Sequence, residues 1–142
     1  MKTNTTVING IAIAAMMLAV AALAQVAKEF SVKSMPPSVV KTVPQAGATD
    51  VDPALKELTF TFSKDMIDGN WSVCQATPKE NFPEAGVGKI HYLPDKRTCV
   101  MPVKLQPGRT YVLWLNRGQY QSFRDTERNS SVPYLLVFET KK

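Results

Sequence analysis

The sequence has few of the residues on which catalysis and metal binding usually depend. Among 142 residues, histidine occurs once, as His91, and cysteine twice, as Cys74 and Cys99. A serine or cysteine nucleophile needs a neighbouring base, and a structural zinc site needs four ligands, so this set supplies neither. The glycine-rich phosphate loop, the dinucleotide fingerprint, the Gly-x-Ser-x-Gly elbow and the His-Glu-x-x-His motif are also absent. These absences predict a protein that is not an enzyme and uses no cofactor or metal ion.

Pairs of carboxylates are the remaining route to catalysis, because two acids suffice for glycoside hydrolysis. The nearest pairs are Asp50 with Asp52 and Asp65 with Asp68. Both pairs stand in turn-like contexts, where aspartate side chains commonly bond to nearby backbone. We interpret them as turn residues. A hydrolase that uses carboxylates alone and a calcium site formed by the same oxygens are the alternatives.

Strongly clustered charge is also missing. The 17 lysines and arginines exceed the 12 aspartates and glutamates, which gives a formal net charge of +5. The densest basic groups are the dipeptides Lys96-Arg97 and Lys141-Lys142. Nucleic-acid-binding domains gather their basic residues on one face or along one helix. We therefore expect no nucleic-acid partner, and a weak, salt-sensitive attraction to anionic envelope polymers at most.

The first two dozen residues have the composition of a secretory signal peptide. Lys2 provides a positive start, residues 11–24 form a nearly unbroken apolar run, and Ala22-Leu23-Ala24 matches the small-x-small cleavage motif before Gln25. The 14-residue run is shorter than the roughly 18 to 20 apolar residues that span a bilayer. We expect cleavage between Ala24 and Gln25. The alternative is an uncleaved anchor, which is the one way in which we expect the chain to contact a membrane.

The rest of the chain is predicted to contain a linker and one domain. Residues 25–37 are polar and basic and end in Pro36-Pro37, which is typical of an exposed linker. From Ser38 onward, short β-type runs alternate with Pro, Gly, Asn and Asp, and no apolar stretch keeps helical spacing over three turns. The predicted strands cover 39–43, 58–62, 71–74, 90–93, 98–103, 110–115 and 134–140. This pattern predicts an all-β domain over 38–142, a two-sheet antiparallel immunoglobulin-like β-sandwich preceded by the helical signal peptide of residues 1–24; a small barrel is the alternative.

Two segments support the sandwich prediction. In Leu58-Thr59-Phe60-Thr61-Phe62 apolar and polar residues alternate, so one face of this strand is expected to meet a core. In Leu105–Tyr111 a Pro-Gly turn leads into a strand that opens with a tyrosine. Immunoglobulin-like sandwiches have such a corner, in which the tyrosine hydroxyl bonds to nearby backbone. The alternative for Tyr111 is a half-buried ring with its hydroxyl in water.

Three segments resemble the bacterial Ig-like domain of the surface-layer type. They are Pro37–Pro44, Gly47–Pro53 and Leu58–Met66, which read PSVVKTVP, GATDVDP and LTFTFSKDM. Domains of that family begin with a proline-bounded strand, a Gly-Ala-Thr-Asp-Val turn and a Thr-Phe-Ser-x-x-Met strand in this order. Leu105–Tyr111 and Leu136–Thr140 are similar to the family's penultimate and last strands. The resemblance implies a β-sandwich of exported and envelope proteins, used as a spacer, display or binding module, and it implies no reaction.

The two cysteines allow a disulfide, because export leads to an oxidising compartment. A bridge between Cys74 and Cys99 would close a loop of about 26 residues. The lost conformational entropy of the unfolded chain would be worth ~3.5 kcal/mol. Two separate buried thiols are the alternative, since spacing alone does not bring two Cα atoms within bridging range. We expect the disulfide.

Residues 116–132 are the segment in which we expect a partner-binding site. The segment is polar and contains two aromatic rings, and rings with polar edges suit both sugars and protein partners. The expected binding residues are Tyr120, Phe123 and Arg124, whereas Trp71 and Trp114 are interpreted as packing residues. We expect a secreted, periplasmic or cell-surface module that binds or scaffolds an envelope protein or polysaccharide without catalysis. The alternative is a carbohydrate-binding module for an envelope or extracellular polysaccharide.

Overall fold

A computed structural model of the chain describes residues 30–76 and 78–142. The signal peptide expected at residues 1–24, its cleavage site between Ala24 and Gln25, and the first part of the linker lie outside the described residues. Residues from Met35 to Lys142 form one compact unit. Across the part of the chain that the structure describes, no helix has the length and apolar content that crossing a bilayer requires.

The larger of two sheets has five strands around a central β6. Its members are β1 (Val39–Val43), β2 (Glu57–Phe62), β4 (Glu84–Ala85), β5 (His91–Tyr92) and β6 (Thr98–Lys104). The order is β1-β2-β6-β4, and β5 also pairs with β6, each pair being antiparallel. The short strands β4 and β5 pair with different parts of β6, since Ala85 lies opposite Val103 and Tyr92 opposite Cys99.

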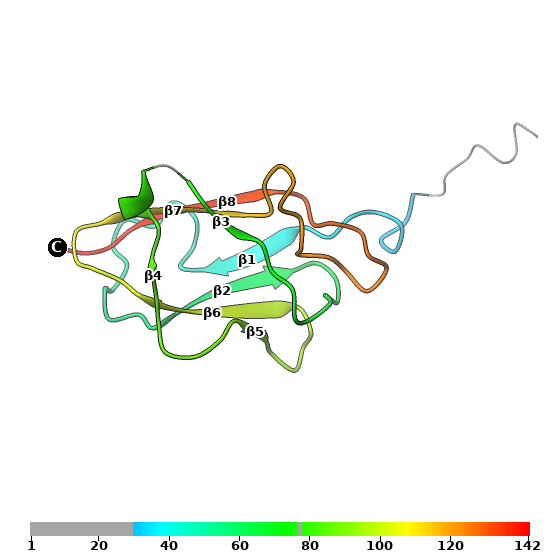
Figure 1. Cartoon of the computed structure of the whole chain (residues 1–142), viewed down its shortest axis with the longest axis horizontal. Coiled ribbons are helices and arrows are strands. Elements are labelled where there is room, and N and C mark those ends of the chain that lie inside the picture. Colours follow the sequence, from blue (N-terminus) through cyan, green and yellow to red (C-terminus); the bar gives the residue numbers. More distant parts are fainter. Residues whose placement is uncertain (1–29, 77) are drawn as a thin grey trace, which may run out of the picture. The chain divides into compact units, whose positions relative to one another are not determined.

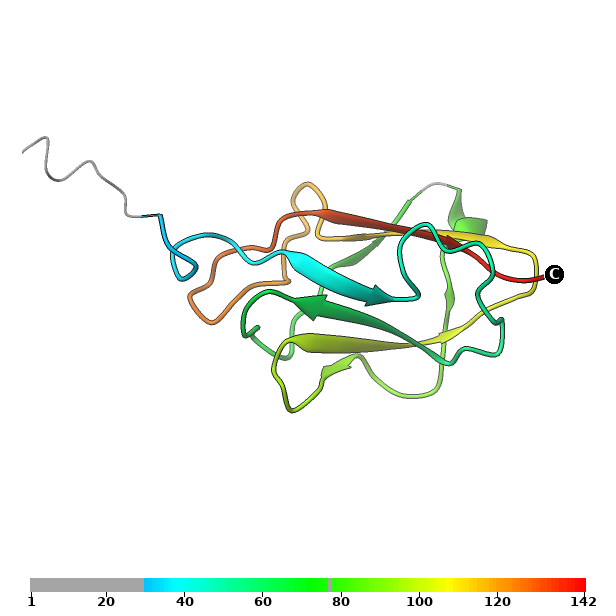
Figure 2. The same cartoon turned by 180° about the vertical axis from the view of Figure 1, so that it is seen from behind.

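The smaller sheet has three strands in the order β3-β7-β8. These are β3 (Val73–Gln75), β7 (Thr110–Leu115) and β8 (Tyr134–Glu139), again antiparallel throughout. A short 3-10 turn, η1 (Lys79–Asn81), follows β3. Figures 1 and 2 show the two sheets as two layers, with β7 and β8 in one and β1, β2 and β6 in the other. The predicted two-sheet antiparallel sandwich is therefore confirmed.

The core lies between the inner faces of the two sheets. Alternate residues of β2 and β7 are buried, as the two-residue period of a strand requires when one face meets a core. The core residues from β2, β7 and β8 are Leu58, Phe60, Phe62, Tyr111, Leu113, Leu115, Leu136 and Phe138. Full burial of one such apolar side chain stabilises the fold by about 1.5–3 kcal/mol.

The tyrosine corner that the sequence predicts is present. The backbone N–H of Gln106 donates to the hydroxyl oxygen of Tyr111 at 2.8 Å, and the Tyr111 ring is 3% exposed. The ring also stacks on Phe138 of β8, with 5.3 Å between the ring centroids. One side chain therefore fixes the turn before β7 and packs the smaller sheet.

Candidate functional site

The chain between β7 and β8, residues 116–132, begins at a buried asparagine that bonds across the whole segment. Asn116 is 0% exposed and has a φ of 57°, a left-handed conformation that asparagine adopts more readily than most residues. Its side-chain nitrogen donates to the carbonyl oxygens of Phe123 at 3.0 Å and Ser131 at 3.2 Å. Its side-chain oxygen accepts the Phe123 N–H at 3.1 Å. Asn116 therefore joins the start, the middle and the end of the segment.

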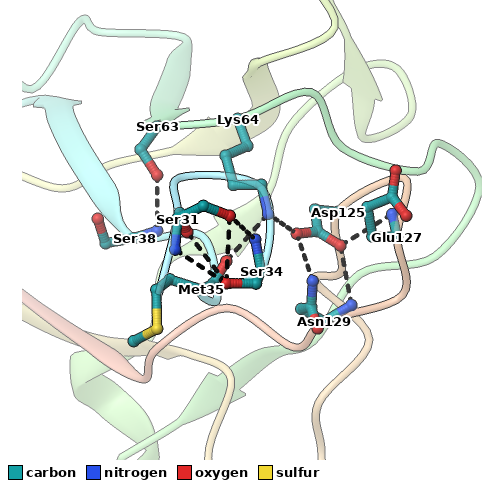
Figure 3. Close-up of polar contacts among 9 residues, drawn as sticks. All are labelled: Ser31, Ser34, Met35, Ser38, Ser63, Lys64, Asp125, Glu127 and Asn129. Carbon is teal, nitrogen blue, oxygen red and sulfur yellow. Dashed lines mark hydrogen bonds and ion pairs between the residues drawn. The ribbon is translucent and has the colours of Figure 1, made fainter. Parts of the chain in front are cut away.

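A second buried polar side chain, Asp125, organises the later half of the segment (Figure 3). Its carboxylate accepts the backbone N–H of Glu127 at 3.0 Å and of Asn129 at 2.8 Å, and it forms an ion pair with Lys64. Lys64 also donates to the Met35 carbonyl at 2.9 Å. Burial by itself raises the pKa of Asp125, but the hydrogen bonds from Lys64 and Asn129 outweigh burial and lower that pKa below its ordinary value. The carboxylate is therefore charged at neutral pH and stabilises the segment.

A tight turn at the start of the segment stands beside β3, an edge strand of the smaller sheet. The backbone groups of Arg117 and Tyr120 bond in both directions at 2.9 Å, and Gly118 between them has a φ of 55°. This turn, residues 117–120, and the strand Val73–Gln75 line a groove of about 580 Å³, which we call the β3 groove. The Tyr120 ring is 61% exposed. The β3 groove is thus open to solvent and has an exposed aromatic ring among its lining residues.

Outward-facing side chains of the smaller sheet lie beside this groove. Cys74 of β3 pairs with Trp114 of β7, and Trp114 alternates with the buried Leu113 and Leu115, so both paired residues belong to the outer face. The guanidinium carbon of Arg117 lies 5.7 Å from the centroid of the Trp114 ring. A cation over an aromatic face is attracted by the ring's quadrupole. The interaction therefore positions the Arg117 side chain over the outer face of the sheet.

The expected disulfide is not formed, because both cysteines are free thiols in the structure. Cys99 lies on β6 opposite Phe60 and belongs to the core, whereas Cys74 belongs to the outer face of the opposite sheet. A bridge needs Cβ atoms about 4 Å apart that point toward each other, and these two point in incompatible directions. Burial raises the pKa of Cys99 to about 12. Burial also raises the pKa of Cys74, and the positive charge of Arg117 partly offsets this shift.

The three expected binding residues have different surroundings. Tyr120 is exposed in the β3 groove, whereas Arg124 is exposed beside a separate hollow of about 350 Å³. Phe123 is 0% exposed and packs against Phe62 with 5.3 Å between the ring centroids. The prediction that Phe123 contacts a partner is therefore wrong, because its ring belongs to the hydrophobic core.

Three of the four carboxylates weighed as catalytic or calcium-binding residues, Asp52, Asp65 and Asp68, have hydrogen-bond or ion-pair partners. Asp52 accepts the backbone N–H two residues later at 2.8 Å, and Asp68 accepts that of the next residue at 2.7 Å. Asp65 forms an ion pair with Arg97 at 2.7 Å. Within residues 30–76 and 78–142, no three side chains of His, Cys, Asp or Glu are grouped as metal ligands. His91 is exposed, and its ring nitrogen lies 3.0 Å from a backbone carbonyl two residues away.

The residues that sequence reasoning missed are the internal supports of the segment, Asn116 and Asp125. The signal for Asn116 is local, since asparagine directly after a strand and before Arg-Gly fits a left-handed residue that starts a turn. The partner of Asp125 is 61 residues away along the chain, so no local pattern identifies the pair. The sequence therefore indicates a polar segment with two aromatic rings, but not the groups that hold it in place.

Two packed antiparallel sheets, the tyrosine corner and the long connection between β7 and β8 define an immunoglobulin-like β-sandwich. The bacterial Ig-like domain family model matches residues 33–140, and the chain belongs to this family. Such domains occur in extracellular and surface proteins of bacteria and are generally not catalytic. Neither the curated proteins nor the solved structures contain a significant match to the chain.

Proposed function

We propose that this chain is an exported, non-enzymatic binding module of the bacterial cell envelope, and that the β3 groove is its recognition surface. The observation that carries the proposal is the exposed Tyr120 ring on a turn that Asn116 and the paired backbone hold in place. A preorganised surface loses less conformational entropy when it binds. Tyrosine and arginine are also enriched among the residues that dominate binding energies. The signal-like N-terminus and the family's usual location support a role in the envelope.

A protein segment is the partner that the groove suits best. All three residues of β3 line the groove, and β3 is an edge strand. Edge strands accept extended peptides through backbone hydrogen bonds, with neighbouring pockets selecting side chains. The groove combines Val73 and the Tyr120 ring with the amide groups of Gln75 and Gln119, and protein partners commonly bind such mixed surfaces.

A polysaccharide is the second candidate, because one feature of the same groove favours it. The flat exposed ring of Tyr120 has the amide side chain of Gln119 beside it, and Gln75 lines the groove as well. A sugar ring stacks on an aromatic face while its hydroxyl groups bond to amides. The sugar platform expected from Tyr120 and Phe123 together is excluded by the burial of Phe123, so this candidate depends on Tyr120 alone.

The test compares three purified chains that carry a C-terminal tag: the parent, Tyr120→Ala and Val87→Ala. Val87 is 93% exposed and does not line the groove, so its truncation is a matched surface control. Each chain is incubated with envelope fractions of the producing bacterium, split into untreated, protease-treated and glycosidase-treated portions. Retained proteins and sugars are then quantified.

We expect the parent and Val87→Ala to retain the same partner and Tyr120→Ala to lose it by about tenfold or more, as hot-spot truncations do. Loss after protease treatment identifies a protein partner, and loss after glycosidase treatment identifies a polysaccharide. Equal retention of all partners by Tyr120→Ala and the parent contradicts the proposed surface.

A further inference from the structure

A second hollow on the domain, separate from the β3 groove, is lined by two arginines. It encloses about 350 Å³ between the turn after β2 and the later part of the 116–132 segment. Its lining residues are Ile67, Asn70, Ser122, Arg124 and Arg128. None of these is acidic, and Arg124 and Arg128 are both exposed at its edge. We call this hollow the arginine pocket.

Backbone hydrogen bonds hold the walls of the arginine pocket together. The N–H of Ile67 donates to the carbonyl oxygen of Arg124 at 2.9 Å, and the N–H of Ser122 donates to the side-chain oxygen of Ser72 at 3.0 Å. The side-chain Nε of Arg124 donates to the Gln121 carbonyl at 2.9 Å. An arginine has five N–H donors in a fixed fork. This bond therefore orients the Arg124 guanidinium and leaves its two terminal nitrogens for other acceptors.

The second arginine sits in an unusual backbone conformation. Arg128 has a φ of 67°, in the left-handed region that glycine adopts most easily. Its N–H donates to the Asp125 carbonyl at 2.8 Å, so it occupies a defined turn on the Asp125 network. A non-glycine residue in this region is strained, and such strain is concentrated at functional sites. Glycine would fit the backbone at position 128 better than arginine does.

The positive charge of the arginine pocket is not neutralised locally. Among the residues that the structure describes, no ion pair joins Arg124 or Arg128 to a carboxylate. Two acids lie between the arginines in the sequence: Asp125 is paired with Lys64 and faces inward with an exposure of 0%, and Glu127 is exposed. Asp68, which follows the lining residue Ile67 in the sequence, accepts the N–H of Gly69. Two guanidinium groups that line one hollow and form no ion pair there attract an anion.

We propose that the arginine pocket binds a tetrahedral oxyanion, phosphate or sulfate, either free or carried as an ester on an envelope polymer. Arginine forks match such oxygens with paired hydrogen bonds, and charge-assisted bonds are about twice as strong as neutral ones. The amide of Asn70 and the hydroxyl of Ser122 offer two more donors at the same hollow. This site is independent of the β3 groove and does not rest on the proposed function.

The test is a titration of the purified chain with sodium phosphate and with sodium sulfate at constant ionic strength, followed by two-dimensional amide NMR. Three variants are compared: Arg124→Gln, Arg128→Gly and the control Arg117→Gln. Arg128→Gly removes the guanidinium while its backbone keeps a φ that glycine prefers, so this variant is expected to fold. Arg117→Gln makes the same change of net charge in the β3 groove, outside the arginine pocket.

We expect saturable shifts of the amides at residues 67, 70, 122, 124 and 128, and about tenfold weaker binding in Arg124→Gln and in Arg128→Gly. Arg117→Gln is expected to bind like the parent. A parallel titration with dextran sulfate against neutral dextran distinguishes the sources, since tighter binding of the charged polymer indicates a polymer-borne ester. The absence of saturable shifts, or equal weakening in all three variants, overturns the proposal.

Discussion

Asn116 and Asp125 differ from most loop residues, because both side chains are fully buried and their polar atoms form hydrogen bonds. A buried polar group without partners costs about 1–3 kcal/mol, whereas a fully bonded one fixes a single arrangement. Asn116 bonds the backbone at two distant points of the 116–132 segment, and Asp125 bonds Lys64 and Asn129. Two side chains therefore fix the conformation of the segment together with its backbone hydrogen bonds.

Replacement of Asp125 by asparagine is expected to destabilise the domain by about 3 kcal/mol at neutral pH, because it removes one partner of a buried ion pair. The folded state lowers the pKa of Asp125, so its contribution is complete above the unfolded pKa of about 4 and is lost as the pH falls through the folded pKa. Urea unfolding of the parent and of Asp125→Asn between about pH 2 and pH 7 measures this difference. A difference in unfolding free energy that does not shrink at low pH contradicts the assigned role.

Replacement of Phe123 by alanine is expected to lower the free energy of unfolding by about 3–5 kcal/mol, because the ring is buried against Phe62. Tyr120→Ala is expected to change it by less than about 0.5 kcal/mol, because the Tyr120 side chain is a surface group. Urea unfolding at one temperature compares the two variants. Similar losses of stability in both variants would show that the burial of these neighbouring rings is misassigned.

The two thiols are expected to differ in reactivity toward a soluble thiol reagent. Cys74 lines the β3 groove and is accessible in the folded chain, whereas Cys99 is 0% exposed and burial raises its pKa to about 12. One thiol per chain is expected to react under native conditions and two after unfolding. The same count is made on protein isolated from an oxidising compartment. The absence of reactive thiols in denaturant would contradict the assignment of free cysteines.

Among the strands, those with alternating apolar and polar residues could be predicted from the sequence. Strands that form only because they pair with a neighbouring strand could not. The alternation in Glu57–Phe62 and in Thr110–Leu115 is visible in the sequence because one face of each strand is buried. Glu84–Ala85 was missed because a two-residue strand has no period, and its pairing with the end of β6 is decided by tertiary structure. The Pro and Gly residues between runs explain why most strand positions were nonetheless correct.

The tyrosine corner depends on one hydrogen bond, from the Gln106 N–H to the Tyr111 hydroxyl. Tyr111→Phe keeps the ring but leaves the Gln106 N–H without its acceptor, so the free energy of unfolding is expected to fall by about 1 kcal/mol. Tyr134→Phe is the control, because the Tyr134 hydroxyl makes no hydrogen bond with any residue that the structure describes. Thermal unfolding of the three chains measures the effect. An equal change in both variants would show that the corner bond does not contribute.

For the whole molecule, composition indicated a polar segment with two aromatic rings but not which of its residues face solvent. Tyr120 and Phe123 are three residues apart in one polar stretch, yet the first is exposed and the second is in the core. Asn116 bonds to both backbone groups of Phe123, whose ring packs on Phe62 in the core. The predicted disulfide is absent for a similar reason, because the outward direction of Cys74 depends on the register of β3 with β7.

Site-specific photo-crosslinking in the living bacterium tests most directly whether the β3 groove is a recognition surface. A photoreactive benzoylphenylalanine replaces Tyr120 in one strain and Val87 in another, and crosslinked products are separated and identified by mass spectrometry. If the β3 groove is a recognition surface, position 120 gives one discrete crosslinked partner and position 87 gives none. No product from position 120, or the same diffuse products from both positions, would contradict it.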